Sequence, residues 1–355
     1  MPRGGGEAYC QRSPTLDLVD QARPNSRLEI RRLLHARPLA GSDVVAYLKK
    51  VTGRHTSPSG GVQKGGPSFF EMALTPYTKP HATPDQRVAH LRARGLVIPR
   101  PTVAARKIEV IGYERLRIYF LARRQLNVPG RPFVPGTSYH DIIALYEGDA
   151  LLRDVCFAAV GQFEILLRNS ISEAVSQAYG SHPYLNSAAF KDPASHISAI
   201  RSLSDVYEKS HDARAKHYRN TYGDPYLPAI WTLKEFLTFG RSSNLYRCLS
   251  GTLRTTVAAD FGVPSDEVFE SWVTCMVDVR NICAHHDRLF NRKLQKQPKT
   301  LTSASIPTAP KPKLKAILEC LDYVMTARGA PVDIVARVGR IIAAYPQMQP
   351  AEAGY

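Results

Sequence analysis

The chain has 355 residues, of which 44% are hydrophobic, and a formal net charge of +16. This length allows one large domain or two smaller ones, and the charge favours a polyanionic partner. The six cysteines are scattered with no Cys-x-x-Cys pair and no run of about 18 apolar residues occurs, so a structural zinc site and a membrane-spanning helix are both disfavoured.

Residues 1–71 are rich in Gly, Pro, Ser and Arg. This composition predicts a low-complexity, poorly ordered extension, although short helices fit residues 27–34 and 43–50. No signal peptide opens the chain, and we expect a reducing, cytoplasmic, soluble setting without a membrane.

The pattern becomes mainly helical from Asp85 onwards, where Pro84 and Asp85 begin a helix. Residues 149–176 form the clearest helix, because their apolar residues recur at helical spacing. Within it, Glu164 precedes Arg168 by four positions, the favourable order for an ion pair on one helix face.

Further helices fit the later part of the chain, at residues 197–215, 231–249, 314–326 and 332–345. Residues 299–313 contain three prolines and are predicted to be a loop. The aromatic residues Trp231 and Phe239 are expected in the core rather than stacked on bases. Long helices with proline-bearing connections and few strand signals predict an all-α bundle.

Another helix begins near residue 264, where Ser265 can cap its first turn and acidic residues suit the positive end of its dipole. Its apolar stripe, continued towards Cys283, places Arg280 where an aliphatic side chain is expected. An unpaired buried charge is costly, so Arg280 needs a partner. A substrate phosphate and a carboxylate from another helix, such as Glu164, are both consistent with the pattern.

The end of this helix carries the residue types that break RNA without a metal: Arg280, Asn281 and His285. Histidine can move a proton near neutral pH, and arginine can clamp a phosphate and stabilise charge as it builds. Arg280 and His285 lie about 140° apart around a helix, at roughly 100° per residue. They can meet if the arginine bends round, if the helix ends near His285, or if a second copy of the motif faces the first, which is the arrangement we favour.

Four blocks of the sequence, in the same order as in the family, resemble the abortive-infection proteins of the AbiD/AbiF type, which belong to the wider HEPN group. They include Thr-Pro-Tyr-Thr-Lys-Pro at 75–80, Glu-Ile-Leu-Leu-Arg at 164–168, Leu-Pro-Ala-Ile-Trp at 227–231 and Val-Arg-Asn through His at 279–285. The resemblance starts just after Met72. Our hypothesis is therefore that Met72 is the biological start and that residues 72–355 form one Abi/HEPN-like helical domain.

The resemblance implies a HEPN-like helical bundle with additional helices and a metal-independent endoribonuclease acting in abortive infection, that is, phage defence. It implies Arg280, Asn281 and His285 as catalytic residues, no cofactor and no metal. It also implies RNA as the partner, a homodimer that brings two motifs to one cleft, and an RNA or protein antitoxin in a toxin–antitoxin pair.

Basic and polar residues that follow the motif are candidates for binding the flanking phosphates of the substrate. They are His286, Arg288, Asn291, Arg292 and Lys293. The basic residues between positions 280 and 299 surround a single acid in the sequence, Asp287, so we expect a positive region beside the candidate acid–base histidine.

Two other interpretations stay open. His286 and Asp287 could be the His-Asp pair of a metal phosphohydrolase, but the same dipeptide recurs at 140–141 and 211–212, and adjacent helical residues point apart. Alternatively, the basic surface could hold RNA or a partner protein in a non-catalytic binding module, with Arg280 and His285 only positioning it.

Overall fold

The computed structural model describes residues 78–355. The chain divides into two units, 1–78 and 79–355, and the second contains all the described secondary structure. The expected extension over residues 1–71, its two short helices and the start at Met72 lie outside the described residues. The described part is all-α, as predicted: it contains thirteen α-helices, three short 3-10 helices and only isolated β-bridges.

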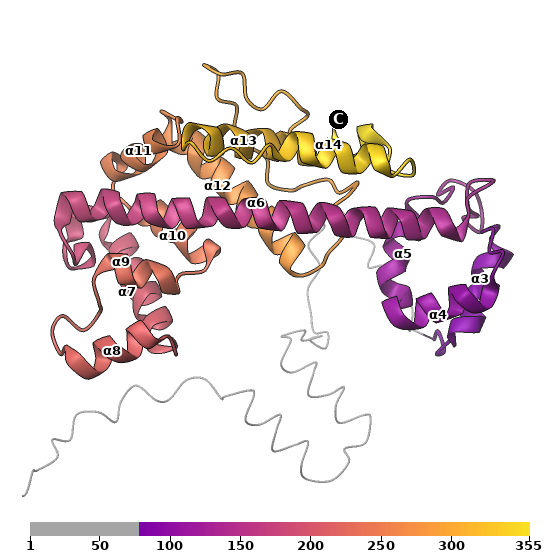
Figure 1. Cartoon of the computed structure of the whole chain (residues 1–355), viewed down its shortest axis with the longest axis horizontal. Helices are drawn as coiled ribbons and strands as arrows, with labels where there is room; N and C mark the ends of the chain where they lie inside the picture. Colours follow the sequence, from indigo (N-terminus) through magenta and orange to yellow (C-terminus); the bar gives the residue numbers. More distant parts are fainter. Residues whose placement is uncertain (1–77) are drawn as a thin grey trace, which may run out of the picture. The chain divides into compact units, whose positions relative to one another are not determined.

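The longest helix, α6, comprises the 41 residues Tyr139–Tyr179 and packs against most of the other elements (Figure 1). It begins at a capping box in which Ser138 accepts from the backbone of Asp141 and Asp141 accepts from the backbone of Ser138. It ends before Gly180, whose φ of 76° suits a residue without a Cβ. The sequence predicted only residues 149–176, because the cap at the start of the helix lies eleven residues earlier.

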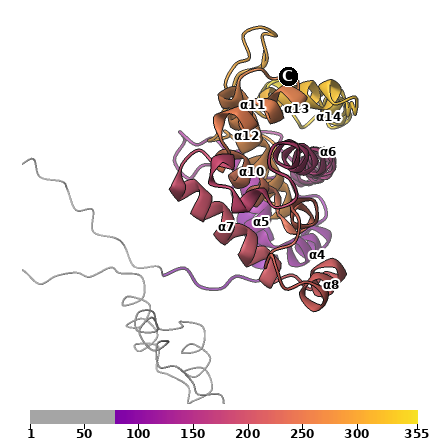
Figure 2. The same ribbon diagram turned by 90° about the vertical axis from the view of Figure 1, so that its left-hand side faces the viewer.

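The C-terminal helices cover one side of α6, and α12 packs across it (Figures 1 and 2). These are α11 (Gly251–Asp260), α12 (Asp266–Ala284), α13 (Leu314–Ala327), α14 (Ile334–Ala344) and the short α15 (Pro350–Ala353). The predicted helices at 314–326 and 332–345 and the loop at 299–313 are confirmed.

Three helices lie beside the N-terminal end of α6 (Figure 1): α3 (Pro84–Ala93), α4 (Pro101–Ile111) and α5 (Tyr113–Leu121). The predicted start of α3 is confirmed, with a capping box between Thr83 and Gln86. Helix α3 packs on α4, and α5 packs on α6.

Two predicted helices are interrupted in the structure. The region 197–215 is divided between α7 (Pro193–Glu208) and α8 (Ala213–Thr221), because the side chain of Asp212 caps a new helix start by accepting from Arg214 N. The region 231–249 contains α9 (Ile230–Leu233), the 3-10 turn η3 (Lys234–Phe236) and α10 (Phe239–Cys248), where Thr238 caps α10.

The core prediction holds for Phe239, which is 1% exposed and contacts Phe163 of α6 edge to face. It is wrong for Trp231, which is 50% exposed on the surface of α9. The five cysteines of the described part are free and buried. No helix between residues 78 and 355 has the length and apolar character needed to cross a membrane.

Candidate functional site

The candidate motif occupies the last turn of α12 and the residues after it. Ser265 caps the helix by accepting from Val268 N, as the sequence predicted, and the helix ends at Ala284 with His285 as its C-cap. Of the three ways in which Arg280 and His285 could meet, the structure therefore provides one, a helix that stops at the histidine. No hydrogen bond joins the two side chains in the described chain.

Arg280 lies on the inner side of α12, with 30% of its side chain exposed. Its Nε is 3.9 Å from Glu164 Oε2, its Nη1 is 3.4 Å from Asn281 Oδ1, and its guanidinium lies 5.9 Å from the centre of the Phe157 ring. The carboxylate partner that the sequence offered as an alternative to a phosphate is thus present.

Glu164 is shared between two arginines. It also pairs with Arg168, one turn further along α6, as its i,i+4 spacing predicted. One carboxylate thus faces two guanidinium groups. It can neutralise only one of their two positive charges, so this group of three side chains keeps a net charge of +1. The buried Nε of Arg280 also has no hydrogen-bond acceptor. A buried donor without an acceptor is uncommon, and it suits a site that receives an anion.

The other two motif residues face solvent. Asn281 and His285 are exposed, and the His285 backbone N–H donates to Asn281 O at 3.0 Å. The imidazole of His285 makes no hydrogen bond within residues 78–355, so both ring nitrogens are available for proton transfer.

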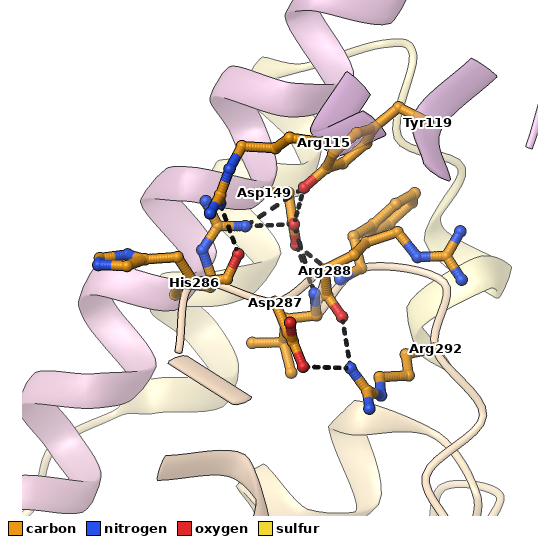
Figure 3. Close-up of polar contacts among 10 residues, drawn as sticks. Arg115, Tyr119, Asp149, His286, Asp287, Arg288 and Arg292 are labelled. Atoms are coloured by element: carbon orange, nitrogen blue, oxygen red, sulfur yellow. Dashed lines mark hydrogen bonds and ion pairs between the residues drawn. The ribbon is translucent and has the colours of Figure 1, made fainter. Parts of the chain in front are cut away.

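The chain after His285 turns sharply and is tied to α5 (Figure 3). His286 adopts a left-handed conformation with φ 55°, its side chain is exposed, and its carbonyl accepts from Arg115 Nη1 at 2.9 Å. Arg288 donates to Asn291 O at 3.2 Å and lies 3.5 Å from Ile118 O. Its guanidinium therefore holds backbone carbonyls of the loop and of α5.

A buried carboxylate beneath this loop fixes its path (Figure 3). Asp149 of α6, whose side chain is fully buried, accepts from Leu289 N at 3.1 Å and from Phe290 N at 2.6 Å. It also accepts from Tyr119 Oη and Arg153 Nη1, each at 2.5 Å. Burial raises the pKa of Asp149, while the Tyr119 hydroxyl and the Arg153 guanidinium oppose the rise.

Sequence reasoning missed this support. Asp149 and Arg153 stand four apart among apolar neighbours of α6, a spacing that signals an inward-facing ion pair and could have been recognised. The contributions of Tyr119 and Arg115 come from α5, far away in the sequence, and no local pattern indicates them.

The positive region expected around the motif is largely neutralised by carboxylates, contrary to the expectation from the sequence. Besides Arg280 with Glu164, the pairs are Arg292 with Asp287 at 3.5 Å, Lys296 with Asp278 at 3.7 Å and Lys299 with Glu267 at 2.7 Å. The expectation considered only residues 280–299, and three of these four acids lie before residue 280.

Two more candidate phosphate ligands differ in their surroundings. Asn291 Nδ2 donates to Glu352 Oε1 at 2.8 Å, so its amide holds the C-terminal helix α15. Lys293 is exposed and has no ion-pair partner in the part of the chain that the structure describes. Of the five residues predicted to bind substrate, only His286 and Lys293 have uncommitted side chains.

The described residues contain no group of three or more His, Cys, Asp or Glu side chains placed to hold a metal ion. His286 and Asp287, which the sequence offered as a possible metal-binding pair, lie on a turn. Within the described residues, no further His, Cys, Asp or Glu side chain joins them in such a group.

A comparison with family models matches residues 106–291 to the family described as Abi-like protein. The matched interval begins within α4 and ends in the loop after α12, so it includes α5, α6 and the whole candidate motif. No curated protein and no solved structure matches the chain significantly.

Proposed function

The chain belongs to the Abi-like protein family, and on that premise we propose that it is a metal-independent endoribonuclease. Membership supports a role in abortive infection, and thus in phage defence, in the broad sense. The observation that carries the finer proposal is that the end of α12 bears both a partly uncompensated guanidinium, on Arg280, and an uncommitted imidazole, on His285.

In the proposed mechanism, the ribose 2′-hydroxyl attacks the adjacent phosphorus in line with the departing 5′-oxygen. One imidazole accepts the 2′-hydroxyl proton, and a second group protonates the leaving oxygen. Arg280 stabilises the charge that develops on the phosphorus oxygens, and Asn281 orients the phosphate. The products carry a 2′,3′-cyclic phosphate on one fragment and a free 5′-hydroxyl on the other.

This chemistry uses an acid as well as a base, and each chain supplies one His285. We therefore propose a homodimer in which the partner's His285 takes the second role. Two exposed apolar side chains on α6 support this arrangement: Phe157, 44% exposed, whose ring centre lies 5.9 Å from the Arg280 guanidinium, and Ile165, 58% exposed and next to Glu164 in the sequence. A second copy of the chain that covers these side chains removes their apolar surface from water.

The test is to incubate purified protein with total RNA in the presence of EDTA and to map new 3′ ends and their chemistry. We expect new ends carrying a cyclic phosphate, and we expect His285→Ala to lower cleavage by roughly 10²–10⁴-fold with the fold intact. His211→Ala, at another exposed histidine, is the matched control and keeps full cleavage.

Cleavage that requires a metal, or undiminished cleavage by His285→Ala, would reject the assignment. Binding of RNA with no new ends, and with equal affinity in the His285 variant, would favour a non-catalytic binding module instead.

A further inference from the structure

The net charge of the described chain is concentrated in a short segment before α6. Residues 79–135, which include α3, α4 and α5, contain 12 Lys and Arg but only 3 Asp and Glu, a net charge of +9. Residues 136–355, almost four times as many, contain 24 Lys and Arg and 22 Asp and Glu. The candidate motif lies in the nearly neutral part, so the excess charge needs a separate explanation.

Four of these arginines, together with His90, gather at one point. Arg87, His90 and Arg94 are three and four positions apart and share a face at the end of α3. The loop after α5 adds Arg124 and Arg131, because it doubles back on itself. Gln125 N donates to Pro132 O at 2.9 Å, and Phe133 N donates to Arg94 O at 2.9 Å. We call these five residues the arginine cluster.

No carboxylate neutralises the arginine cluster within the described residues. Aromatic rings hold two of its guanidinium groups instead: Arg87 lies 4.4 Å from the centre of the Tyr113 ring, and Arg124 lies 4.8 Å from that of Phe133. An aromatic ring attracts a guanidinium without neutralising its charge or accepting from its N–H groups in the ring plane. The Nε of Arg124 is buried without a hydrogen-bond partner.

The members of the cluster repel one another. Burial and the nearby charge of Arg94 lower the pKa of Arg124, and burial together with Arg94 and Arg124 lowers the pKa of His90. Elsewhere in the same segment, arginines avoid this cost by pairing, as Arg106 does with Glu109 at 2.7 Å. Like charges held together without counter-charges are typical of a site that an anion completes.

Helix α5 connects the cluster to the candidate motif. Near its start, Arg115 donates to the carbonyl of His286, and from there the helix continues to Leu121 for about 9 Å at 1.5 Å per residue. Arg124 follows within the next turn. This separation is short enough for a single strand several nucleotides long to span it.

We propose that the arginine cluster is a second binding site, which holds backbone phosphates of an RNA strand whose scissile phosphodiester lies at Arg280 and His285. The choice of RNA rests on the proposed function, whereas the site itself rests on the geometry of Arg87, Arg94 and Arg124.

The test measures the affinity for a single-stranded RNA by fluorescence anisotropy at several salt concentrations, in a His285→Ala background that prevents cleavage. Arg94→Gln with Arg124→Gln removes two charges of the cluster. Arg201→Gln with Arg340→Gln is the matched control, because both residues are exposed arginines without an ion-pair partner in the described chain. Arg131→Gly is a further variant, since its φ of 48° suits glycine and the loop keeps its conformation.

We expect the cluster double variant to bind roughly tenfold or more weakly and to show a shallower salt dependence, by about 0.7 in slope for each phosphate that the cluster no longer neutralises, with a smaller decrease for Arg131→Gly. Affinity and slope equal to those of the control, for both cluster variants, would overturn the proposal. Cleavage by the wild type is measured separately. If binding depends on the cluster but the wild type does not cleave RNA, the nuclease proposal is rejected and the binding site is supported. If the wild type cleaves RNA but binding does not depend on the cluster, the binding site is rejected and the nuclease proposal is supported.

Discussion

The last turn of α12 and the loop that follows it are neighbours in sequence, but the protein holds them very differently. In the loop, the backbone N–H groups of Leu289 and Phe290 donate to the buried carboxylate of Asp149, and two carbonyls accept from Arg115 of α5 and from Arg288 of the loop itself. In the last turn, the side chains of Asn281 and His285 face solvent, and that of His285 is bound to nothing in the described chain.

Under the proposed function, this difference separates the structural support from the reacting groups within about ten residues. A reactive histidine must be free to exchange protons, yet its backbone must be fixed within a fraction of an ångström. The backbone directly after His285 is anchored, whereas its side chain is not, which is the arrangement that the proposed function requires. Arg280 is intermediate, since Glu164 contacts it at 3.9 Å but is shared with Arg168.

Among the changes that test how the loop is anchored, Asp149→Asn is expected to have the largest effect. The change removes the negative charge between two backbone N–H groups and leaves the Arg153 guanidinium buried without its counter-charge. We expect the free energy of unfolding to fall by about 3–5 kcal/mol, as for other buried pairs broken on one side. Urea denaturation measures the change.

Asp154→Asn is the control for that experiment, because Asp154 is an exposed carboxylate on the same helix. It should change the free energy of unfolding by less than about 0.5 kcal/mol. Equal stability of the two variants would mean that the loop is held by packing of Leu289 and Phe290 and not by the carboxylate.

A smaller effect is expected at the far end of the same loop, where Glu352 joins two elements. Its carboxylate accepts from Arg123 at 3.0 and 3.2 Å and from Asn291 at 2.8 Å, and both ion-pair partners are mostly buried. Glu352→Gln weakens these charge-assisted bonds, and we expect a loss of about 1–2 kcal/mol in the free energy of unfolding.

Glu147→Gln provides the comparison for Glu352, since Glu147 pairs with Lys107 at 3.2 Å on the surface. Exposed pairs contribute little, so its loss should stay below about 1 kcal/mol by the same denaturation measurement. A Glu352 variant as stable as the Glu147 variant would show that α15 does not brace the loop.

The parts of the fold that sequence predicted well are those specified locally. Thr83 and Ser265 cap α3 and α12 within one turn of their own positions, and the i,i+4 pair of Glu164 and Arg168 needs no knowledge of other helices. The failures are non-local. Trp231 resembles a core residue in sequence because nothing local reveals that its helix, which begins at Ile230, stops after one turn.

The same distinction applies to the candidate site. The motif positions Arg280, Asn281 and His285 were predicted as catalytic from residue types and family resemblance, and that role stays a prediction. Their surroundings were not predictable, because the acids that neutralise the flanking lysines and arginines and the donors that hold Asp149 come from other segments. Counting charge along the sequence therefore placed the positive region at the motif, whereas the uncompensated excess lies in residues 79–135.

The smallest effect is expected at Cys283, which lies between the two exposed motif positions on the opposite face of α12. Its side chain is buried, and burial raises the pKa of the thiol to about 12. At pH 8 almost no thiolate forms, so N-ethylmaleimide should leave Cys283 unmodified in the folded protein and cleavage unchanged. Peptide mass spectrometry measures the modification, with urea-unfolded protein as the positive control. Rapid labelling of Cys283 in the folded protein would mean that the end of α12 opens readily, and the sharp division between its buried and exposed faces would then disappear.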